Sequence, residues 1–257
     1  MRSFSFDIET IPDVEFGRRQ MGLDGLDDKD VATAMFFKRQ QAVGHEFLPL
    51  HQHRVAAISV ALRTGEKFKV WTLGEEDSDE AEIIGRFFDG IARYTPDLVS
   101  WNGGGFDLPV LHYRALKHGI QAPRYWEVGQ NDRDFKWNNY LSRYHWRHTD
   151  LMDVLANFNP RANAKLDEIA SMLGFPGKLG MDGSKVWDTW LAGGIREIRD
   201  YCETDVLNTW LVYLRFEFMR GNLDAADLER EYGLVRATLS AAGAPHLDEF
   251  LAAWPQG

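Results

Sequence analysis

The run at residues 3–8 constrains the fold most, because it alternates apolar and polar side chains at the period of a β-strand. Such a strand presents Phe4, Phe6 and Ile8 on one face and Ser5, Asp7 and Glu9 on the other. The apolar face requires a sheet with a covering layer. The two acids share the other face, where a pair of this kind can simply face solvent.

Further strand and helix patterns follow. Residues 54–63 and 67–73 are β-rich and are separated by a three-residue segment that contains Gly65, which predicts a hairpin. Residues 98–101 form a short apolar strand. Helical spacing is present at residues 78–94, 107–118, 150–157, 165–173 and 194–220. The order of these elements predicts an α/β fold.

The length of 257 residues fits one large domain with an appendage. We assign residues 1–220 to the main domain. Residues 13–50, with a helical pattern at 31–43, are interpreted as an insertion. Residues 221–257 are expected to form a C-terminal appendage of two short helices.

Composition bounds the class of protein. Hydrophobic residues make up 44% of the chain, and no apolar run has the length of about 20 residues that a membrane helix needs. With no apolar signal core at the N-terminus, we expect a cytoplasmic protein without a membrane partner. Cys202 is the single cysteine and is interpreted as a packing residue. The net charge of −10 argues against binding nucleic acid mainly by phosphate neutralisation, although acids clustered locally weaken that argument.

Two more acidic positions accompany the strand acids. Asp107 follows the strand 98–101 and a glycine-rich turn, at the start of a predicted helix, where an acid is also a usual first-turn residue. Tyr201 and Asp205 are four residues apart and so lie on one face of a helix. Each feature alone is ordinary.

Together, the segments FDIET, WNGGGFDLPVLHYR and YCETD, in this order, resemble the three motifs of the tyrosine-bearing DEDD exonucleases. The second motif resembles the proofreading exonuclease domain of family-B DNA polymerases through Asn102, Phe106, Asp107, Pro109, Leu111 and Arg114. The resemblance spans residues 4 to about 216. It leaves no room for polymerase palm or fingers regions, so the chain resembles a stand-alone exonuclease with the family's ribonuclease-H-like fold, a mixed sheet flanked by helices.

The resemblance implies a metal-dependent 3′-5′ exonuclease that degrades single-stranded DNA and releases nucleoside 5′-monophosphates. Two divalent ions, Mg²⁺ or Mn²⁺, would be held by four carboxylates, since such ions prefer oxygen ligands. Asp7 would bridge the ions, Glu9 and Asp205 would complete the first site, and Asp107 would support the second. Tyr201 would orient the attacking water, because a phenol with a pKa of about 10 is a poor base.

Candidate contacts to nucleic acid are of two kinds. The resemblance places Thr10 beside the 3′-terminal nucleotide, although Thr10 could equally end the strand, and it places Asn102 in the loop of the second motif, with Phe106 as a further contact. Residues 133–148 are rich in aromatic and basic side chains, a composition that suits stacking on unpaired bases. The candidates in that stretch are Trp137, Tyr140, Arg143 and Trp146. A surface hairpin with its aromatics packed beneath it is the alternative.

Other polar residues receive structural interpretations. Asp150 and Asp153 are expected to cap a turn and helix, and His51, His53 and His148 to be packing or surface residues. Trp187, Trp190 and Trp210 lie in helical apolar patterns and are expected in the core. Gly103, Gly104 and Gly105 depart from the relatives' motif, in which this segment carries side chains.

Three rival functions remain open at this point. A 3′-5′ exoribonuclease would share the same motifs, although the second motif favours DNA. A non-catalytic nucleic-acid-binding module could keep the fold. A glycosidase could use Asp7 and Glu9 as its paired carboxylates, but would leave Asp107, Tyr201 and Asp205 unused.

Overall fold

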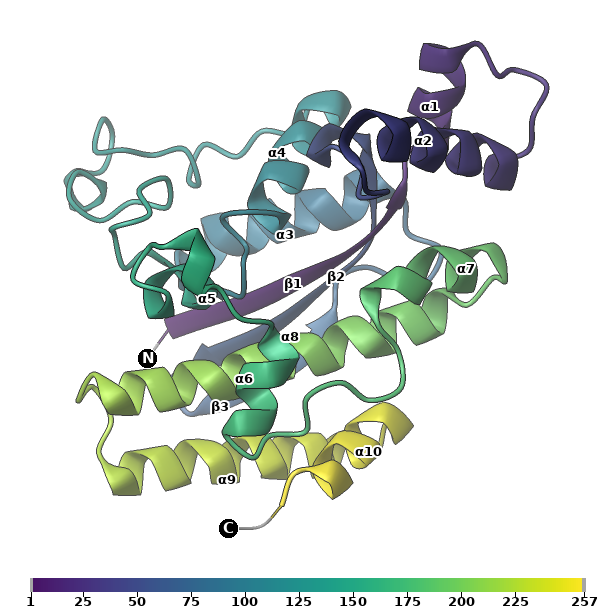
Figure 1. Cartoon of the computed structure of the whole chain (residues 1–257). Helices are drawn as coiled ribbons and strands as arrows, with labels where there is room; N and C mark the ends of the chain where they lie inside the picture. Colours follow the sequence, from purple (N-terminus) through teal and green to yellow (C-terminus); the bar gives the residue numbers. More distant parts are fainter. Residues whose placement is uncertain (1, 256–257) are drawn as a thin grey trace.

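A five-stranded sheet with the order β3-β2-β1-β4-β5 forms the centre of the computed structural model, which describes residues 2–255 (Figure 1). The strands are β1 (Arg2–Pro12), β2 (His53–Thr64), β3 (Lys67–Thr72), β4 (Asp97–Ser100) and β5 (His148–Asp150). β1, β2 and β3 pair antiparallel, whereas β4 pairs parallel with β1 and β5 parallel with β4. The predicted α/β class with a mixed sheet, as in the ribonuclease-H-like exonucleases, is confirmed.

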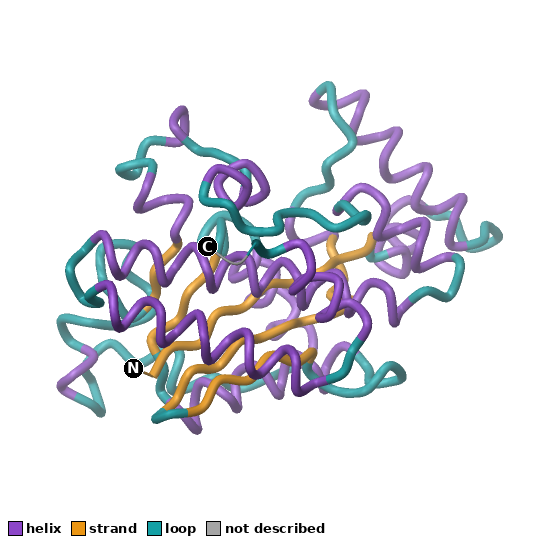
Figure 2. Tube along the Cα trace, turned by 90° about the horizontal axis from the view of Figure 1, so that it is seen from below, coloured by secondary structure: helices purple, strands orange, loops and turns teal. Residues whose placement is uncertain are grey.

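Helices cover both faces of the sheet. They are α1 (Val14–Met21), α2 (Asp28–Val43), α3 (Glu80–Tyr94), α4 (Asp107–His118), α5 (Leu151–Leu155), α6 (Leu166–Met172), α7 (Val186–Leu191), α8 (Ile195–Met219), α9 (Ala225–Ala242) and α10 (Pro245–Ala253). α3 and α4 lie against one face, and α8 crosses the other (Figures 1 and 2). No helix among residues 2–255 combines the length and apolarity needed to cross a membrane.

β1 is buried on both faces, which places its acids inside the molecule. On one face the ring of Phe6 lies 5.1 Å from that of Phe87 in α3. On the other face, α8 covers the polar residues, and the Cys202 thiol donates to the backbone oxygen of Asp7 at 3.4 Å. The sequence pattern allowed the acids to face solvent, but α8 removes that option. Glu9 is only 7% exposed.

The C-terminal helices share a core with α8. Leu239 of α9 and Phe250 of α10 are fully buried, in the same apolar cluster as Trp210 of α8. α9 and α10 lie side by side beneath α8 in Figure 1. α9 has 18 residues, so the expectation of two short helices understated its length.

Residues 13–50, which we interpret from the sequence as an insertion, contain α1 and α2, which pack closely together. A side chain at Gly17 would collide with Met35 of α2, so only glycine allows this approach. Asp13 caps α1 by accepting from the amide of Phe16 at 3.1 Å. In Figure 1 the two helices lie at the C-terminal end of β1.

A buried ionic network fixes the base of this insertion. The guanidinium of Arg114 in α4 donates to Glu80, at the start of α3, at 2.5 and 2.7 Å. It also donates to Asp13, and Arg114 itself is 2% exposed. Breaking a buried pair leaves an uncompensated charge, so this network holds the end of β1 against α3 and α4.

The stretch between α4 and β5 is irregular. The hairpin alternative for residues 133–148 is wrong, because the chain forms one short 3-10 helix there, Arg133–Phe135, and enters a strand only at His148, the first residue of β5. Tyr140 is 2% exposed, stacks on Tyr125 at 5.5 Å, and donates its hydroxyl to the oxygen of Pro96 at 2.7 Å. These contacts make Tyr140 part of the core.

Candidate active site

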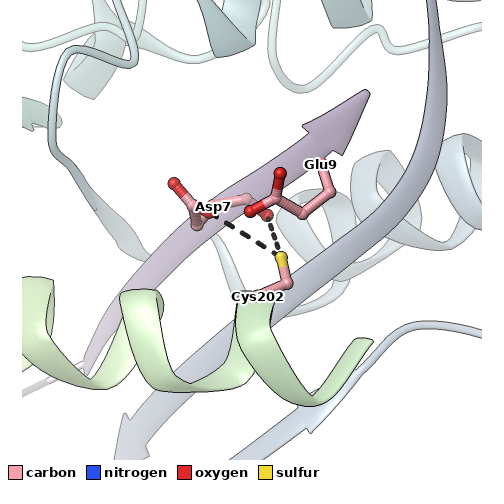
Figure 3. Close-up of side chains that lie close together, drawn as sticks. All are labelled: Asp7, Glu9 and Cys202. Carbon is pink, nitrogen blue, oxygen red and sulfur yellow. Dashed lines mark hydrogen bonds between the residues drawn. The ribbon is translucent and has the colours of Figure 1, made fainter. Parts of the chain in front are cut away.

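Acids from three separate elements converge on one cavity. Asp7 of β1, Asp107 at the start of α4, and Tyr201 and Asp205 of α8 line a cavity of about 360 Å³. Glu9 lies beside Asp7 on β1, and carboxylate oxygens of the two, together with the Cys202 sulfur, lie within 4.8 Å of one another (Figure 3). The structure therefore brings together all five residues that the sequence singled out for catalysis.

Asp107 is held against β1 by a direct hydrogen bond. Its Oδ1 accepts from the amide of Ile8 at 3.2 Å. That amide lies past the end of the β1–β4 pairing, which stops at Ser5 and Val99. The start of α4 therefore takes the place that another strand residue would have, directly beside the acids of β1.

The glycine-rich turn before α4 is packed tightly and anchored by Asp150. The Asp150 carboxylate accepts from the amides of Asn102 and Gly104, each at 2.9 Å. A side chain at Gly103 would collide with Ser100. The glycines thus serve a compact turn. Asp150 also caps α5, as predicted.

Burial raises the pKa of Asp7, Glu9, Asp107 and Asp205, and repulsion from the other site acids adds to the shift at Asp7 and Glu9. Burial and the neighbouring Asp107, Glu9 and Asp205 raise the pKa of Asp7. Burial, with Asp205 next, raises the pKa of Glu9. Burial also raises the pKa of Asp107 to about 7 and that of Asp205 to about 6. These carboxylates are poised to gain from an added cation.

The protein itself supplies little compensating charge. None of the four carboxylates forms an ion pair with any residue in the described range 2–255. The Lys178 ammonium is the cation that lowers the pKa of Glu9 and Asp205, and its residue is exposed. Clustered carboxylates that lack a cationic partner form a donor set that fits hard divalent cations.

Tyr201 and Cys202 stay protonated. Burial and then Asp205, Glu9 and Asp7 raise the pKa of the Tyr201 phenol above its ordinary value of 10.0. Burial also raises the pKa of the Cys202 thiol well above its usual value, so the thiol donates weakly to Asp7. Hard cations prefer oxygen to a neutral thiol. Cys202 is fully buried, as predicted for a packing residue.

Two residues that line this cavity, Lys178 and Asn208, were not predicted from the sequence. Lys178 lies in an irregular segment between α6 and α7, where no periodicity marks it. Asn208 holds that segment in place, because its amide nitrogen donates to the oxygen of Gly177 at 2.9 Å and its oxygen accepts from the Gly177 amide at 3.1 Å. Asn208 continues the helical face of Tyr201 and Asp205, a spacing that could have identified it.

The histidines and tryptophans for which the sequence predicted structural roles lie as follows in the fold. His148 is buried and bonds Ser100 at 2.8 Å, and His53 is also buried, whereas His51 contacts the ring of Phe16 at 5.8 Å. The three histidines form no shared site among the described residues. Trp210 lies in the core, but Trp187 and Trp190 are only half-buried.

The proposed nucleic-acid contacts occupy different parts of the structure. Thr10 and Phe106 line a second cavity beside the acids, and Asn102 lines the acidic cavity itself. Arg143 and Trp146 line a third cavity of about 610 Å³, which shares Asn102 with the acidic one. Trp137 is a surface residue, 79% exposed. Tyr140 must be removed from the predicted contacts, because a ring buried in the core cannot stack on a base.

The raised pKa of Asp107 predicts how stability depends on pH without metal. The unfolded carboxyl loses its proton near pH 4 and the folded one near pH 7, so stability falls as pH rises through this window. Asp107→Asn removes the effect and keeps the bond to Ile8. In EDTA, we expect the variant to match the wild type at pH 4 and to exceed it at pH 8 by about 2 to 4 kcal/mol in unfolding free energy.

Chemical denaturation at several pH values tests this expectation. Mn²⁺ should raise the unfolding temperature of the wild type more at pH 8 than at pH 5, since ionised ligands bind cations better. A constant difference between wild type and Asp107→Asn across the pH range would contradict the assigned pKa shift.

Comparison with known proteins locates the chain in a family. Residues 45–254 match the family described as predicted 3′-5′ exonucleases related to the exonuclease domain of PolB. The match contains Asp107, Tyr201 and Asp205, whereas Asp7 and Glu9 precede it. DNA polymerase 1 of Saccharolobus solfataricus is 47% identical over 45 residues, which cover 18% of this chain and 5% of the polymerase.

Asp7 and Glu9 lie outside the matched region, but the fold brings them close to Asp107 and Asp205, which lie within it. A nuclease that hydrolyses nucleic acid is the activity that this family supports in general. The chain belongs to the family of predicted 3′-5′ exonucleases related to the exonuclease domain of PolB.

Proposed function

We propose that this protein is a 3′-5′ exonuclease that hydrolyses single-stranded DNA and releases nucleoside 5′-monophosphates. The observation that carries the proposal is the convergence of four carboxylates from β1, α4 and α8 near Tyr201, none of which forms an ion pair with a residue in the described range. Among nucleases, such a set holds divalent ions. When bound, two such ions neutralise the phosphate, acidify a water and stabilise the leaving oxyanion.

The electrostatic neighbours support distinct roles for the acids. All three of the other carboxylates repel Asp7 and raise its pKa, Asp107 most strongly. This position suits a ligand shared by two cations. Among the neighbouring carboxylates, Asp205 raises the pKa of Glu9 most, so these two residues would complete one cation site. Asp107, at the start of α4, would support the second cation site.

Tyr201 has a positioning role in this proposal. Its protonated hydroxyl lies close to Asp205 and can orient a water by a hydrogen bond, but it cannot accept that water's proton at neutral pH. The phosphodiester is cleaved when water oxygen attacks phosphorus and the bond to the 3′-oxygen of the penultimate nucleotide breaks. That oxygen leaves with the strand as a new 3′-hydroxyl.

Digestion of matched oligonucleotides tests the function. With Mg²⁺ or Mn²⁺, a 5′-labelled DNA strand should shorten stepwise, and EDTA should stop the reaction. The same ladder from an RNA strand should appear more slowly. Faster digestion of RNA would assign an exoribonuclease, and cleavage of neither strand would leave only a binding module of this fold.

The surface aromatics predict where the rest of the strand lies. Trp137 and Trp146 are exposed by 79% and 48%, and Arg143 lies in the cavity next to the acidic one. Stacking on such rings contributes about 1 to 3 kcal/mol per base. We expect the combined alanine variant at these three positions to bind a single strand at least about tenfold more weakly.

Fluorescence anisotropy with labelled DNA and Ca²⁺ measures that affinity without turnover. Phe37→Ala is the matched control, because Phe37 is 61% exposed and lines none of the three cavities. Equal affinities of the triple variant and the control would exclude this surface as the strand-binding site.

A further inference from the structure

Two lysines, Lys165 and Lys178, line the acidic cavity. Burial raises the pKa of Glu9 and of Asp205, and the ammonium of Lys178 acts in the opposite direction on both. Among the described residues, Lys165 has no such effect on any of the four site acids. The charge of Lys178 is therefore directed at the two carboxylates that would complete the first cation site.

The backbone around Lys178 is fixed to α8 and α6. The side chain of Asn208, which is 1% exposed, bonds both the amide and the oxygen of Gly177. The next amide, that of Lys178 itself, donates to Oδ1 of Asp167 in α6 at 2.8 Å. Asn208 lies about one helical turn after Asp205 on α8. The segment that carries Lys178 is thus attached to the helix that carries one of its two target acids.

Lys178 acts on these acids without pairing with them. Its ammonium forms no ion pair with any residue in the range 2–255. The residue is also exposed. A cation in direct contact would occupy carboxylate oxygens, whereas a separated one leaves them free for a metal ion and still attracts them through space.

Such a cation has opposite effects on the two states of the site. Without metal, the ammonium attracts ionised Glu9 and Asp205 and offsets part of their mutual repulsion. With a metal ion on the same carboxylates, two cations face each other and repel. A divalent ion adds at least one net positive charge even where it displaces a proton, so the sign of this repulsion does not depend on the protonation of the acids.

Resting on the metal site of the proposed exonuclease, we propose that Lys178 is a counter-ion of the protein's own, which stabilises the metal-free site and weakens its affinity for the first divalent ion. Lys178 thereby sets the metal concentration at which the enzyme becomes active. The role is electrostatic and requires no contact between Lys178 and the substrate.

Mn²⁺ binding to Lys178→Met tests the proposal. The substitution removes the charge, keeps the backbone bond to Asp167 and adds no oxygen that could bind metal. The EPR signal of free Mn²⁺, recorded at pH 8 without DNA, gives the affinity. The variant should bind Mn²⁺ about three- to tenfold more tightly than the wild type. Lys165→Met and Lys178→Arg, which both keep a charge at position 178, should bind Mn²⁺ as the wild type does.

Thermal unfolding in EDTA gives a second readout, in which the variant is the weaker protein. Lys178→Met should unfold about 1 to 3 °C below the wild type, because the acids lose their counter-ion. A residue that only packs would lower the unfolding temperature without raising the Mn²⁺ affinity. The gain in affinity should also shrink in about 1 M salt, where the Debye length is about 3 Å.

The outcomes separate this inference from the function on which it rests. Equal or weaker Mn²⁺ binding by Lys178→Met would overturn the counter-ion and leave the metal site standing. Slower digestion at saturating Mn²⁺ with an unchanged Mn²⁺ affinity would also overturn it, since Lys178 would then act on the substrate. Absence of Mn²⁺ binding to the wild type would overturn the metal site and the counter-ion together.

Discussion

Asp7→Ala should reduce the rate of DNA digestion by about a thousandfold or more, which corresponds to about 4 kcal/mol of lost transition-state stabilisation. Asp7 is repelled by Asp107, Glu9 and Asp205 together, so it is the proposed common ligand of both cations, and its loss removes that ligand. The measurement is the rate of shortening of a 5′-labelled single strand at saturating Mg²⁺ or Mn²⁺.

The fold should survive this change. The wild-type carboxylate is buried and repelled by its neighbours, so its removal relieves a cost in the metal-free protein. We expect the unfolding temperature in EDTA to stay equal or rise, and Mn²⁺ to stabilise the variant less than the wild type. Asp24→Ala, at an exposed acid, is the control. Wild-type digestion rates in purified Asp7→Ala would refute the metal site.

Asp205→Ala and Tyr201→Phe should differ sharply in effect. Asp205 would hold a cation, and its loss should cost about a thousandfold in rate and raise the metal concentration required. Tyr201→Phe removes one hydrogen bond to water. This change should cost about ten- to a hundredfold in kcat and leave the metal requirement unaltered.

Tyr213→Phe is a matched control for the tyrosine, because Tyr213 lies on the same helix and its hydroxyl contacts Ser3 at 3.5 Å, outside the acidic cavity. Its digestion rate should match the wild type. If Tyr201→Phe proved more damaging than Asp205→Ala, the division between a water-orienting and a metal-holding residue would be wrong.

Local periodicity was sufficient to predict the main elements and the placement of two pairs of candidate residues. A period of two places Asp7 and Glu9 on one side of β1, and a spacing of four places Tyr201 and Asp205 on one face of α8. Both relations depend on the backbone alone, so they hold whatever the rest of the chain does. The resemblance supplied Asp107, whose place beside Ile8 no periodicity contains.

Features that depend on distant contacts could not be predicted this way. β5 has only three residues and forms because β4 offers an edge with which it can pair. α7 has only six residues, too few for a clear helical period. Tyr140 reads as a surface aromatic in a basic stretch, yet its partners, Tyr125 and Pro96, are remote in sequence. The packing of Phe47 against Phe106 was equally hidden, because this contact joins residues that are remote in sequence.

β1 pairs with β2 along its whole length and with β4 at Ser3–Ser5, and helices cover both of its faces, which has a consequence for how this protein could diversify. Backbone amides in such a strand exchange with solvent only when the whole domain opens. The two acids on β1 therefore sit on the least adaptable part of the molecule. The exposed residues Glu46, Phe47, Arg143 and Tyr144 border the neighbouring cavities from loops, where substitution is tolerated best, so these borders can vary over generations while the acids of β1 stay fixed.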